Sequence, residues 1–246
     1  AQLLYGKPDA AGFRSVLARF LRATPAAGAS PKRFGLLADW LRVAMRTLGA
    51  KGVPLILRAR AGAPPPHGAV LDGLLCRQGA TAPGAALVRG LKSPVQNVRA
   101  ACLLAMQSRS VPAAVPVLFG RLAQQPLTSK TIPLWKWVPY YLALDRAKPT
   151  VAAVRAALGN RHELVRIVAL RLAPRFGKAL GAEVLRAGKN ALIEVQTACA
   201  VALGAMGIGQ AQLRVWIRHR DPSLRVEALL SAVQQGQRER GRLAGA

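Results

Sequence analysis

The sequence predicts an all-α fold in which short helices form repeating pairs, without any sheet. Three observations lead to this prediction. A nine-residue pattern recurs in the C-terminal part of the chain, turn and cap residues precede each copy, and short amphipathic segments separate the copies. Repeats of this period are typical of two-helix units that stack on one another.

The recurring pattern begins with an aliphatic residue, continues with Arg or Gln, and favours small residues at its third, fourth and seventh offsets, with Val168, Leu172 and Glu227 as exceptions. The copies are VRAACLLAM from Val98, VRIVALRLA from Val165, VQTACAVAL from Val195 and LRVEALLSA from Leu224. Their spacings are 67, 30 and 29 residues, so a degenerate copy is expected midway in the first gap, at Ile132. Offsets of three, four and seven share one face of a helix, where small residues let a neighbouring helix approach closely.

Polar and glycine residues around the copies predict where the helices begin and end. The expected helix starts are marked by Ser93-Pro94, Asn160, Asn190 and Asp221-Pro222. The expected C-terminal stops are Gly177, Gly204 and Gly236. The partner helices between the copies are expected at residues 112–122, 150–158, 181–188 and 211–219.

With these residues the chain resembles the HEAT-type α-solenoids, in the branch whose repeats carry the signature D-P-x-x-x-V-R-x-A-A-x-x-A-L-G. The match is good at residues 93–106, 160–173 and 190–204 and partial at 221–232. The resemblance implies an α-solenoid of antiparallel helix pairs. The domains expected from it are residues 1–90, a helical region of divergent repeats or a cap, residues 91–236, the HEAT-like repeats, and residues 237–246, a basic tail.

The charge of the chain is far from balanced. Its 36 Lys and Arg residues face 10 Asp and Glu residues, which gives a formal net charge of +26. Such an excess repels itself, and a polyanion neutralises it, so nucleic acid is the expected partner, with RNA favoured. Of these cations 27 are Arg, which holds phosphate in a fork and stacks on bases. A base composition that favours Arg codons would explain Arg in place of Lys, but not the shortage of carboxylates.

Two sets of basic residues are candidates for phosphate contacts. The first set is the arginine at the first offset of three of the four copies, Arg99, Arg166 and Arg225. These arginines either pack on backbone carbonyls, a structural role, or reach phosphates. The second set forms three clusters, made of Arg171, Arg175 and Lys178, of Arg186 and Lys189, and of Arg214, Arg218 and Arg220. Like charges four residues apart on a helix repel one another, which a bound polyanion reverses. The alternative is a solvated face, but solvated faces normally mix both charge signs.

The stretch IPLWKWVPYY, residues 132–141, concentrates aromatic residues in a chain that is 5% aromatic. Its candidate stacking residues are Trp135, Trp137, Tyr140 and Tyr141. The stretch falls on the degenerate copy, where Pro139 is expected to break or kink the helix. Two interpretations stay open: the aromatics fill the core of a distorted repeat, or they form a platform for bases.

No catalytic signature is present in the sequence, and no enzymatic activity is expected. It lacks nucleophile, zinc-protease and phosphate-loop motifs, and its three His residues are far apart, so neither a metal, a cofactor nor a small-molecule substrate is expected. One enzymatic alternative remains, because some HEAT-like proteins are DNA glycosylases that use a carboxylate and tryptophans. In this chain Asp145 with Trp135 and Trp137 could imitate that arrangement.

The three cysteines are an odd number without metal-site spacing. Cys102 and Cys199 occupy the fourth offset of their copies, so both are expected to be buried and unbridged, and Cys76 is expected to be free. Free cysteines predict a reducing, intracellular compartment. The start at Ala1 without Met fits removal of a leader, which suggests an organelle such as the mitochondrial matrix.

These observations lead to two expected functions. The first is a basic, non-catalytic scaffold that binds RNA through its phosphates, as a structural component of a ribonucleoprotein such as an organellar ribosome. The alternative is a protein interaction scaffold for an acidic partner. No stretch is apolar enough to predict a membrane span.

Overall fold

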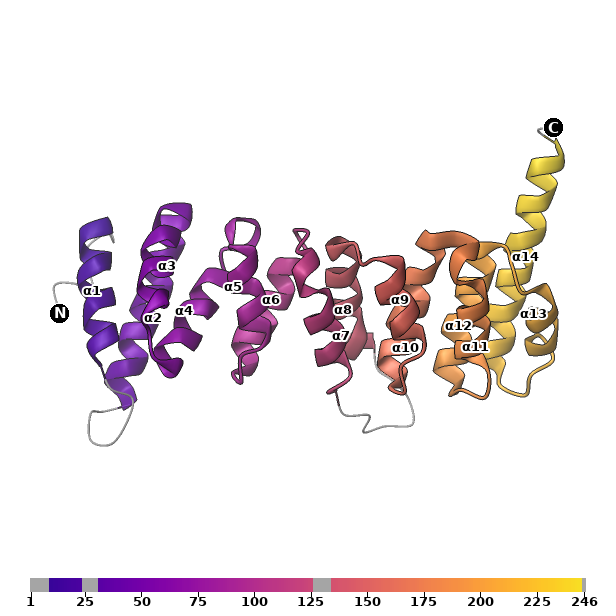
Figure 1. Cartoon of the computed structure of the whole chain (residues 1–246), viewed down its shortest axis with the longest axis horizontal. Coiled ribbons are helices and arrows are strands. Elements are labelled where there is room, and N and C mark those ends of the chain that lie inside the picture. The colour runs from indigo at the N-terminus through magenta and orange to yellow at the C-terminus, as the bar shows by residue number, and fades with distance from the viewer. Residues whose placement is uncertain (1–8, 24–30, 126–133, 245–246) are drawn as a thin grey trace. The chain divides into compact units, whose positions relative to one another are not determined.

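Every regular element in the part of the chain that the structure describes is helical. The structure is a computed structural model, and it describes residues 9–23, 31–125 and 134–244. No strand occurs among these residues, where the helices α1 to α14 follow one another (Figure 1). The prediction of an all-α fold is therefore confirmed for them. The degenerate copy expected at Ile132 begins outside the described residues.

The chain divides into two compact units, residues 1–117 and residues 118–246. The division falls inside α7 (Val115–Leu122). The domain boundary expected near residue 90 lies within the first unit. Each unit has buried apolar side chains of its own.

The described residues of the first unit form the helices α1 to α6 and the start of α7, together with short 3-10 turns. Its helices are α1 (Ala10–Arg22), α2 (Pro31–Leu48), α3 (Val53–Ala61), α4 (Pro65–Cys76), α5 (Gly84–Leu91) and α6 (Gln96–Met106). The 3-10 turns are η2 (Gly49–Gly52), η3 (Gly79–Thr81) and η4 (Pro112–Ala114). Asp9 caps α1, since its carboxylate accepts a hydrogen bond from the N–H of Gly12 at 2.6 Å.

A shared core holds α1 to α4 together. Phe20 of α1, Phe34 of α2 and His67 of α4 form a mutual aromatic cluster with ring centroids 4.9 to 5.2 Å apart. His67 is buried and its Nε2 lies 2.7 Å from the carbonyl oxygen of Ala23, just after α1. Apolar burial and this one polar contact fix α4 against α1.

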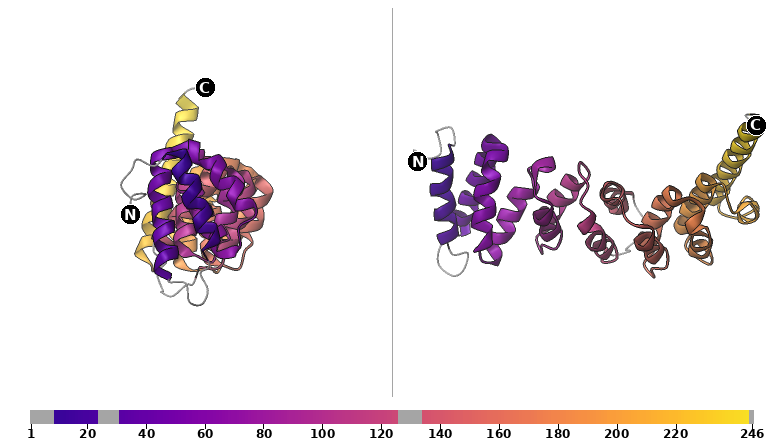
Figure 2. Two further views of the ribbon diagram at one scale, coloured as in Figure 1. Left: turned by 90° about the vertical axis from the view of Figure 1, so that its left-hand side faces the viewer. Right: turned by 45° about the horizontal axis from the view of Figure 1, so that its top comes forward.

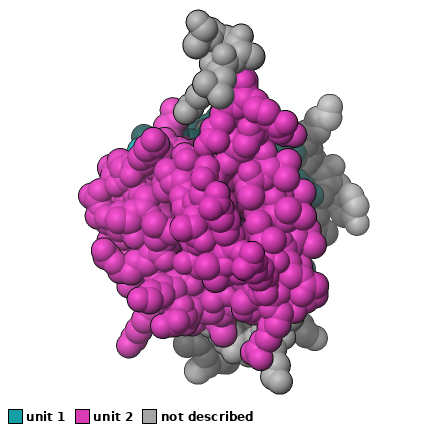
Figure 3. Space-filling model, turned by 90° about the vertical axis from the view of Figure 1, so that its right-hand side faces the viewer, with its two compact units in different colours: residues 1–117 teal, residues 118–246 magenta. Residues whose placement is uncertain are grey.

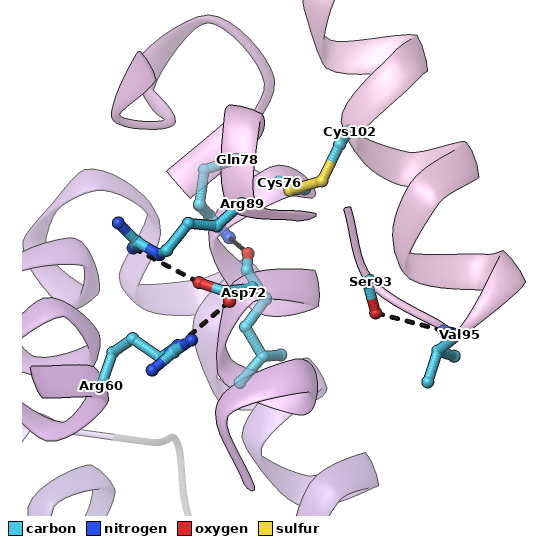
Figure 4. Close-up of a disulfide and its surroundings, with 9 residues drawn as sticks. Arg60, Asp72, Cys76, Gln78, Arg89, Ser93, Val95 and Cys102 are labelled. Atoms are coloured by element: carbon cyan, nitrogen blue, oxygen red, sulfur yellow. Dashed lines mark hydrogen bonds and ion pairs between the residues drawn. A yellow bond between two sulfur atoms is a disulfide. The ribbon is translucent and has the colours of Figure 1, made fainter. Parts of the chain in front are cut away.

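A buried carboxylate joins the next three helices. Asp72 of α4 is 6% exposed at its side chain and lies between Arg60 of α3, at 3.0 Å, and Arg89 of α5, at 3.4 Å (Figure 4). A buried charge is stable only when it is paired and hydrogen-bonded, so the two guanidinium groups are needed where they are. Asp72 thus fixes α4 between α3 and α5.

A disulfide joins Cys76, the last residue of α4, to Cys102 of α6 (Figure 4). The prediction that both cysteines are free was wrong, although Cys102 is fully buried as expected. The two Cα atoms are 4.7 Å apart, and Gly90 of α5 leaves the space for the sulfurs. A Cβ at Gly90 would overlap Cys102 Sγ and come within 2.8 Å of Cys76 Sγ. The argument for a reducing compartment rested on free cysteines and loses that basis.

The second unit continues the succession of short helices and ends in a long one. After α7 it contains α8 (Leu134–Ala147), α9 (Val151–Leu158), α10 (Glu163–Leu172), η5 (Ala173–Leu180), α11 (Gly181–Gly188), α12 (Ile193–Met206), α13 (Gln210–Trp216) and α14 (Pro222–Ala244). Helix α10 packs on α8, α9 and α12, and α12 packs on α11 and α14. The C-terminal half of α14 projects past α12 and α13 (Figure 1 and Figure 2). Most of the expected basic tail is therefore helical.

The four copies of the sequence pattern begin at the same helical position. Val98, Val165, Val195 and Leu224 are each the third residue of their helix, in α6, α10, α12 and α14. All four side chains are buried. The last copy could also be aligned from Val226, two residues later, but that residue is the fifth of α14 and is 55% exposed, so it breaks the shared register.

Gly204 was expected to end a helix, and that prediction was wrong. Helix α12 continues to Met206 and ends at Gly207, whose φ of 69° is the left-handed conformation that favours glycine. Gly204 instead allows close packing, since a Cβ there would lie 2.6 Å from Cβ of Ser231 in α14. Gly236 likewise lies inside α14, whereas Gly177, with φ 55°, interrupts η5.

Cys199 is a buried thiol, as its place in the pattern predicted. Its Sγ donates to the carbonyl of Val184 at 3.1 Å, and burial raises the pKa of Cys199 to about 12. A thiol with this pKa is almost wholly protonated at neutral pH and reacts slowly.

We predict that the native oxidised protein has no fast-reacting thiol. Unfolding in denaturant without a reductant should expose one thiol, that of Cys199, and reduction should add the two of Cys76 and Cys102. Thiol titration with a chromogenic disulfide reagent measures each step. Three thiols in denaturant before reduction would show that the disulfide is absent.

Candidate nucleic-acid interface

The first-offset arginines hold the loop that precedes their own helix. In Arg99, Arg166 and Arg225, Nη1 donates to the carbonyl six residues earlier, at 2.8, 3.3 and 3.1 Å. Arg99 and Arg225 also reach the next carbonyl, at 2.6 and 3.1 Å. The carbonyls at six residues' distance belong to Ser93, Asn160 and His219. We call this bond the arginine clasp.

The residue that the clasp holds also bonds through its own side chain. Ser93 Oγ, Asn160 Oδ1 and His219 Nδ1 each accept the N–H two residues later, at 3.2, 2.9 and 3.0 Å. Such side-chain bonds mimic a backbone turn. Each of the three loops is therefore fixed twice, by a local turn and by an arginine from the helix that follows.

This arrangement corrects the expected helix caps. Ser93 and Asn160 turn the loop and do not cap a helix, because α6 and α10 begin after Val95 and His162. Asp221 does cap α14, since its Oδ1 accepts from the N–H groups of Ser223 and Leu224 at 2.9 and 3.1 Å.

The loop before α12 lacks the clasp. Its first-offset residue is Gln196, which makes no such bond among the described residues, and whose Oε1 is buried without a hydrogen-bond partner. At the position equivalent to Ser93 and Asn160, Asn190 has a φ of 53°, a left-handed conformation that Asn tolerates. This loop follows a different path from the other three.

A cavity of about 340 Å³ lies beside this loop in the second unit. It is bounded by the loop after α9, with Asn160, and by the loop after α11, with Asn190. The charged residues that line it are Arg155, Arg166, Glu183, Arg186 and Lys189. Four cations and one carboxylate therefore surround a space large enough for a phosphate group.

Two of these cations are held by bonds within the protein, and two are available to bind a ligand. Arg155 Nε donates to Glu183 at 2.8 Å and its Nη2 to the carbonyl of Ala179 at 3.1 Å, whereas Arg166 pairs with Glu163 at 3.5 Å. The side chains of Arg186 and Lys189 are exposed and have no hydrogen-bond or ion-pair partner among the described residues. Arg155 and Arg166 therefore form part of the cavity wall. The side chains of Arg186 and Lys189 give the cavity a positive charge that no described carboxylate pairs with.

Glu183 keeps its negative charge in this surrounding. A hydrogen bond from the backbone, together with the bond from Arg155, lowers the pKa of Glu183 below its usual value. The carboxylate therefore stays ionised at neutral pH and holds Arg155 in place, while the remaining lining charge is positive.

The aromatic stretch lies in α8, and its best described member is buried. Trp137 is 8% exposed, Tyr141 meets it edge-on at 6.4 Å, and Arg171 of α10 lies 5.7 Å from the Trp137 ring centroid. Tyr140 is half-buried and its hydroxyl accepts from Gln125 at 3.0 Å. The side chain of Trp135 lies outside the described residues. Trp137 thus packs α8 against α10 through a cation–π contact, and its ring is not open to a base here.

Pro139 does not break the helix as expected, since α8 continues through it to Ala147. Near its end, the carboxylate of Asp145 pairs with Arg175, which also donates to the Asp145 carbonyl at 2.9 Å. Asp145, the carboxylate of the glycosylase alternative, is therefore engaged by a guanidinium.

The remaining basic candidates are dispersed, and Arg171 is half-buried against Trp137. Arg171 belongs to α10 and Arg175 to η5, so the expected spacing of four on one helix was wrong, and Arg218 lies beyond the end of α13. Lys178, Arg214, Arg218 and Arg220 are all exposed. Of the predicted residues, the cavity brings together only Arg166, Arg186 and Lys189.

The sequence interpretation missed Arg155 and the two asparagines of the cavity. Arg155 and Glu183 are 28 residues apart and lie in consecutive predicted partner helices. A search for opposite charges one repeat apart could have found this pair.

No family model, curated protein or solved structure matches this chain. No group of three or more metal-ligating side chains occurs within residues 9–23, 31–125 and 134–244. Over the same residues, no helix combines the length and apolar character that crossing a membrane requires.

We predict that Arg99→Gln destabilises the protein by about 1–2 kcal/mol, because two loop carbonyls lose a charged donor. Arg58→Gln is the matched control, since Arg58 is exposed on α3 and has no described partner, and it should change stability by less than about 0.5 kcal/mol. Urea denaturation measures both. Equal stability of the two variants would show that the clasp contributes nothing.

We predict that Trp137→Ala lowers the free energy of unfolding by about 3–5 kcal/mol, as loss of a large buried aromatic does. Binding of RNA should weaken only to the extent that the protein unfolds. Thermal denaturation and fluorescence anisotropy with a labelled RNA separate the two effects. Unchanged stability with affinity reduced at every salt concentration would instead identify a stacking residue.

Proposed function

We propose that this protein is a non-catalytic, basic helical scaffold that binds RNA through phosphates, as a structural component of a ribonucleoprotein. The observation that carries the proposal is the cavity between the loops after α9 and α11, lined by four cations and one carboxylate. Guanidinium and ammonium groups around a space of this size suit a phosphate.

The use of the carboxylates supports a polyanionic partner. Five of the ten pair with arginines inside the protein: Asp39, Asp72, Asp145, Glu163 and Glu183. Asp9 and Asp221 cap helices. Few carboxylates are left to neutralise the exposed cations, so the net positive charge faces solvent and attracts a polyanion.

The HEAT-like solenoid of antiparallel helix pairs is part of the same proposal. Its support is the common register of α6, α10, α12 and α14 and the arginine clasp that three of them share. In such an array each repeat places one loop at the same edge of the stack. Successive loops could then contact successive positions along a nucleic-acid backbone. The engagement of Asp145 by Arg175 supports a non-catalytic role. An organellar ribosome remains a candidate assembly, but the disulfide gives no support for a reducing compartment.

The test is the salt dependence of RNA binding when Arg186 and Lys189 are both changed to Gln. If each neutralises one phosphate, the slope of log affinity against log salt should decrease by about 1.4, since each contact on a single strand contributes about 0.7. Fluorescence anisotropy with a labelled single-stranded RNA measures this slope.

A matched control keeps the loss of charge the same. Lys51 and Arg58 of the first unit are also exposed and without described partners, and changing both to Gln should leave the slope nearly unchanged. An equal decrease in both double variants would reject the cavity as the phosphate site. Absence of any salt-dependent RNA binding in the unaltered protein would reject the proposed function.

A further inference from the structure

A second surface, unrelated to the cavity, lies on α14. Val226, Leu229, Leu230 and Val233 are 55%, 52%, 58% and 47% exposed, and their spacing of three and four residues sets them along one face of the helix. We call this face the α14 stripe. Four large aliphatic side chains in a row on a surface are unusual and mark a site of contact.

The opposite face of α14 is already used by α12. Gln235 donates from Nε2 to the carbonyls of Leu203 and Ile208 at 2.9 and 2.7 Å, and Ser231 packs on Gly204. The α14 stripe therefore faces away from α12. Figure 3 shows the side of the second unit that lies at the α14 end of Figure 1.

The equivalent positions on the two preceding helices of the series are less exposed. Counted from the third residue of each helix, they correspond in α10 to Ile167 and Leu170, which are 3% and 0% exposed, and to Arg171 and Pro174, which are half-buried. In α12 they correspond to Ala200 and Gly204, which are buried, and to Thr197 and Val201, which are half-buried. Gly204 of α12 meets Ser231 of α14, so this face of α12 receives a helix. The α14 stripe receives none from the described residues.

The charge around the stripe indicates the kind of helix that would fit. Arg225 flanks its first turn, Arg220 lies just before α14, and Arg240 follows two turns after Val233. Glu227 is the carboxylate near the stripe on the other flank. With a net charge of +26, a second copy of this chain would be repelled, whereas an acidic helix would be attracted.

We propose that the α14 stripe is a docking site for an amphipathic helix of an acidic partner protein, which packs on α14 as α14 packs on α12. This site is separate from the RNA cavity and does not depend on it. It assigns the second unit two functions, phosphate binding at the loops between its helix pairs and helix docking at α14.

The probe is a labelled synthetic peptide with leucine along one face of a helix and glutamate along the other. Two control peptides carry lysine in place of glutamate, or serine in place of leucine. The acidic amphipathic peptide should bind at least about tenfold more tightly than either control, because the site needs both apolar contact and opposite charge. Equal binding of the acidic peptide and its serine control would mean plain charge attraction and would overturn the proposal.

The double change Val226→Ser with Leu230→Ser tests the location. Both side chains are more than half exposed, so helix content and melting temperature should be retained, while peptide affinity should fall by about tenfold or more. Val215→Ser is the matched control, since Val215 is 63% exposed on α13, and it should not change the affinity. Unaltered binding in the double variant would place the peptide elsewhere and reject the site.

Two further measurements complete the test. Analytical ultracentrifugation of the unaltered protein should show a monomer, and a dimer that the double change abolishes would assign the stripe to a second copy and overturn the acidic partner. RNA binding by the double variant should equal that of the unaltered protein, so failure of the docking proposal and failure of the RNA proposal give different results.

Discussion

The hydrogen bond from a first-offset arginine to the loop before its helix is the interaction on which the repeated part of this structure depends. A loop that turns tightly into a helix leaves carbonyl groups that no helix can satisfy. Arg99, Arg166 and Arg225 satisfy them from within the next helix, so the loop and the start of the helix become one rigid element. Helix α12 begins at the same register without this bond, so the bond fixes the loop and the repeated pattern fixes the register.

This use of arginine divides the basic residues into two classes. Some are structural, since they hold loop carbonyls, a buried carboxylate or the ring of Trp137. Others, such as Arg186 and Lys189, have no described partner and define the electrostatic surface. Where Gln196 replaces the arginine, the loop takes another path and the cation-lined cavity lies beside it. The departure from the repeat and the candidate site therefore coincide.

The sequence predicted what depends on local spacing and missed what depends on distant contacts. The helices and the buried positions of Val98 and Cys199 follow from periodicity within nine residues. Cys76 pairs with Cys102 across an intervening helix, and Cys76 lies outside the recurring pattern, so no local signal indicated the bond. Gly204 was taken for a helix stop because its packing role becomes visible only once α14 lies against it. For the candidate site, Arg186 and Lys189 were predicted, but the cavity that joins them to Arg155 needs the folded chain.

The disulfide also determines how the first unit would respond to tension. It encloses α5 and much of α6 in a covalent loop, because its cysteines are 26 residues apart. When a force pulls the chain apart from its N-terminus, the residues inside this loop cannot extend. The extension would therefore be shorter by about 90 Å than that of the reduced chain. Reduction of the disulfide would thus increase the extended length of the chain under tension. It would leave the net charge of the protein almost unchanged.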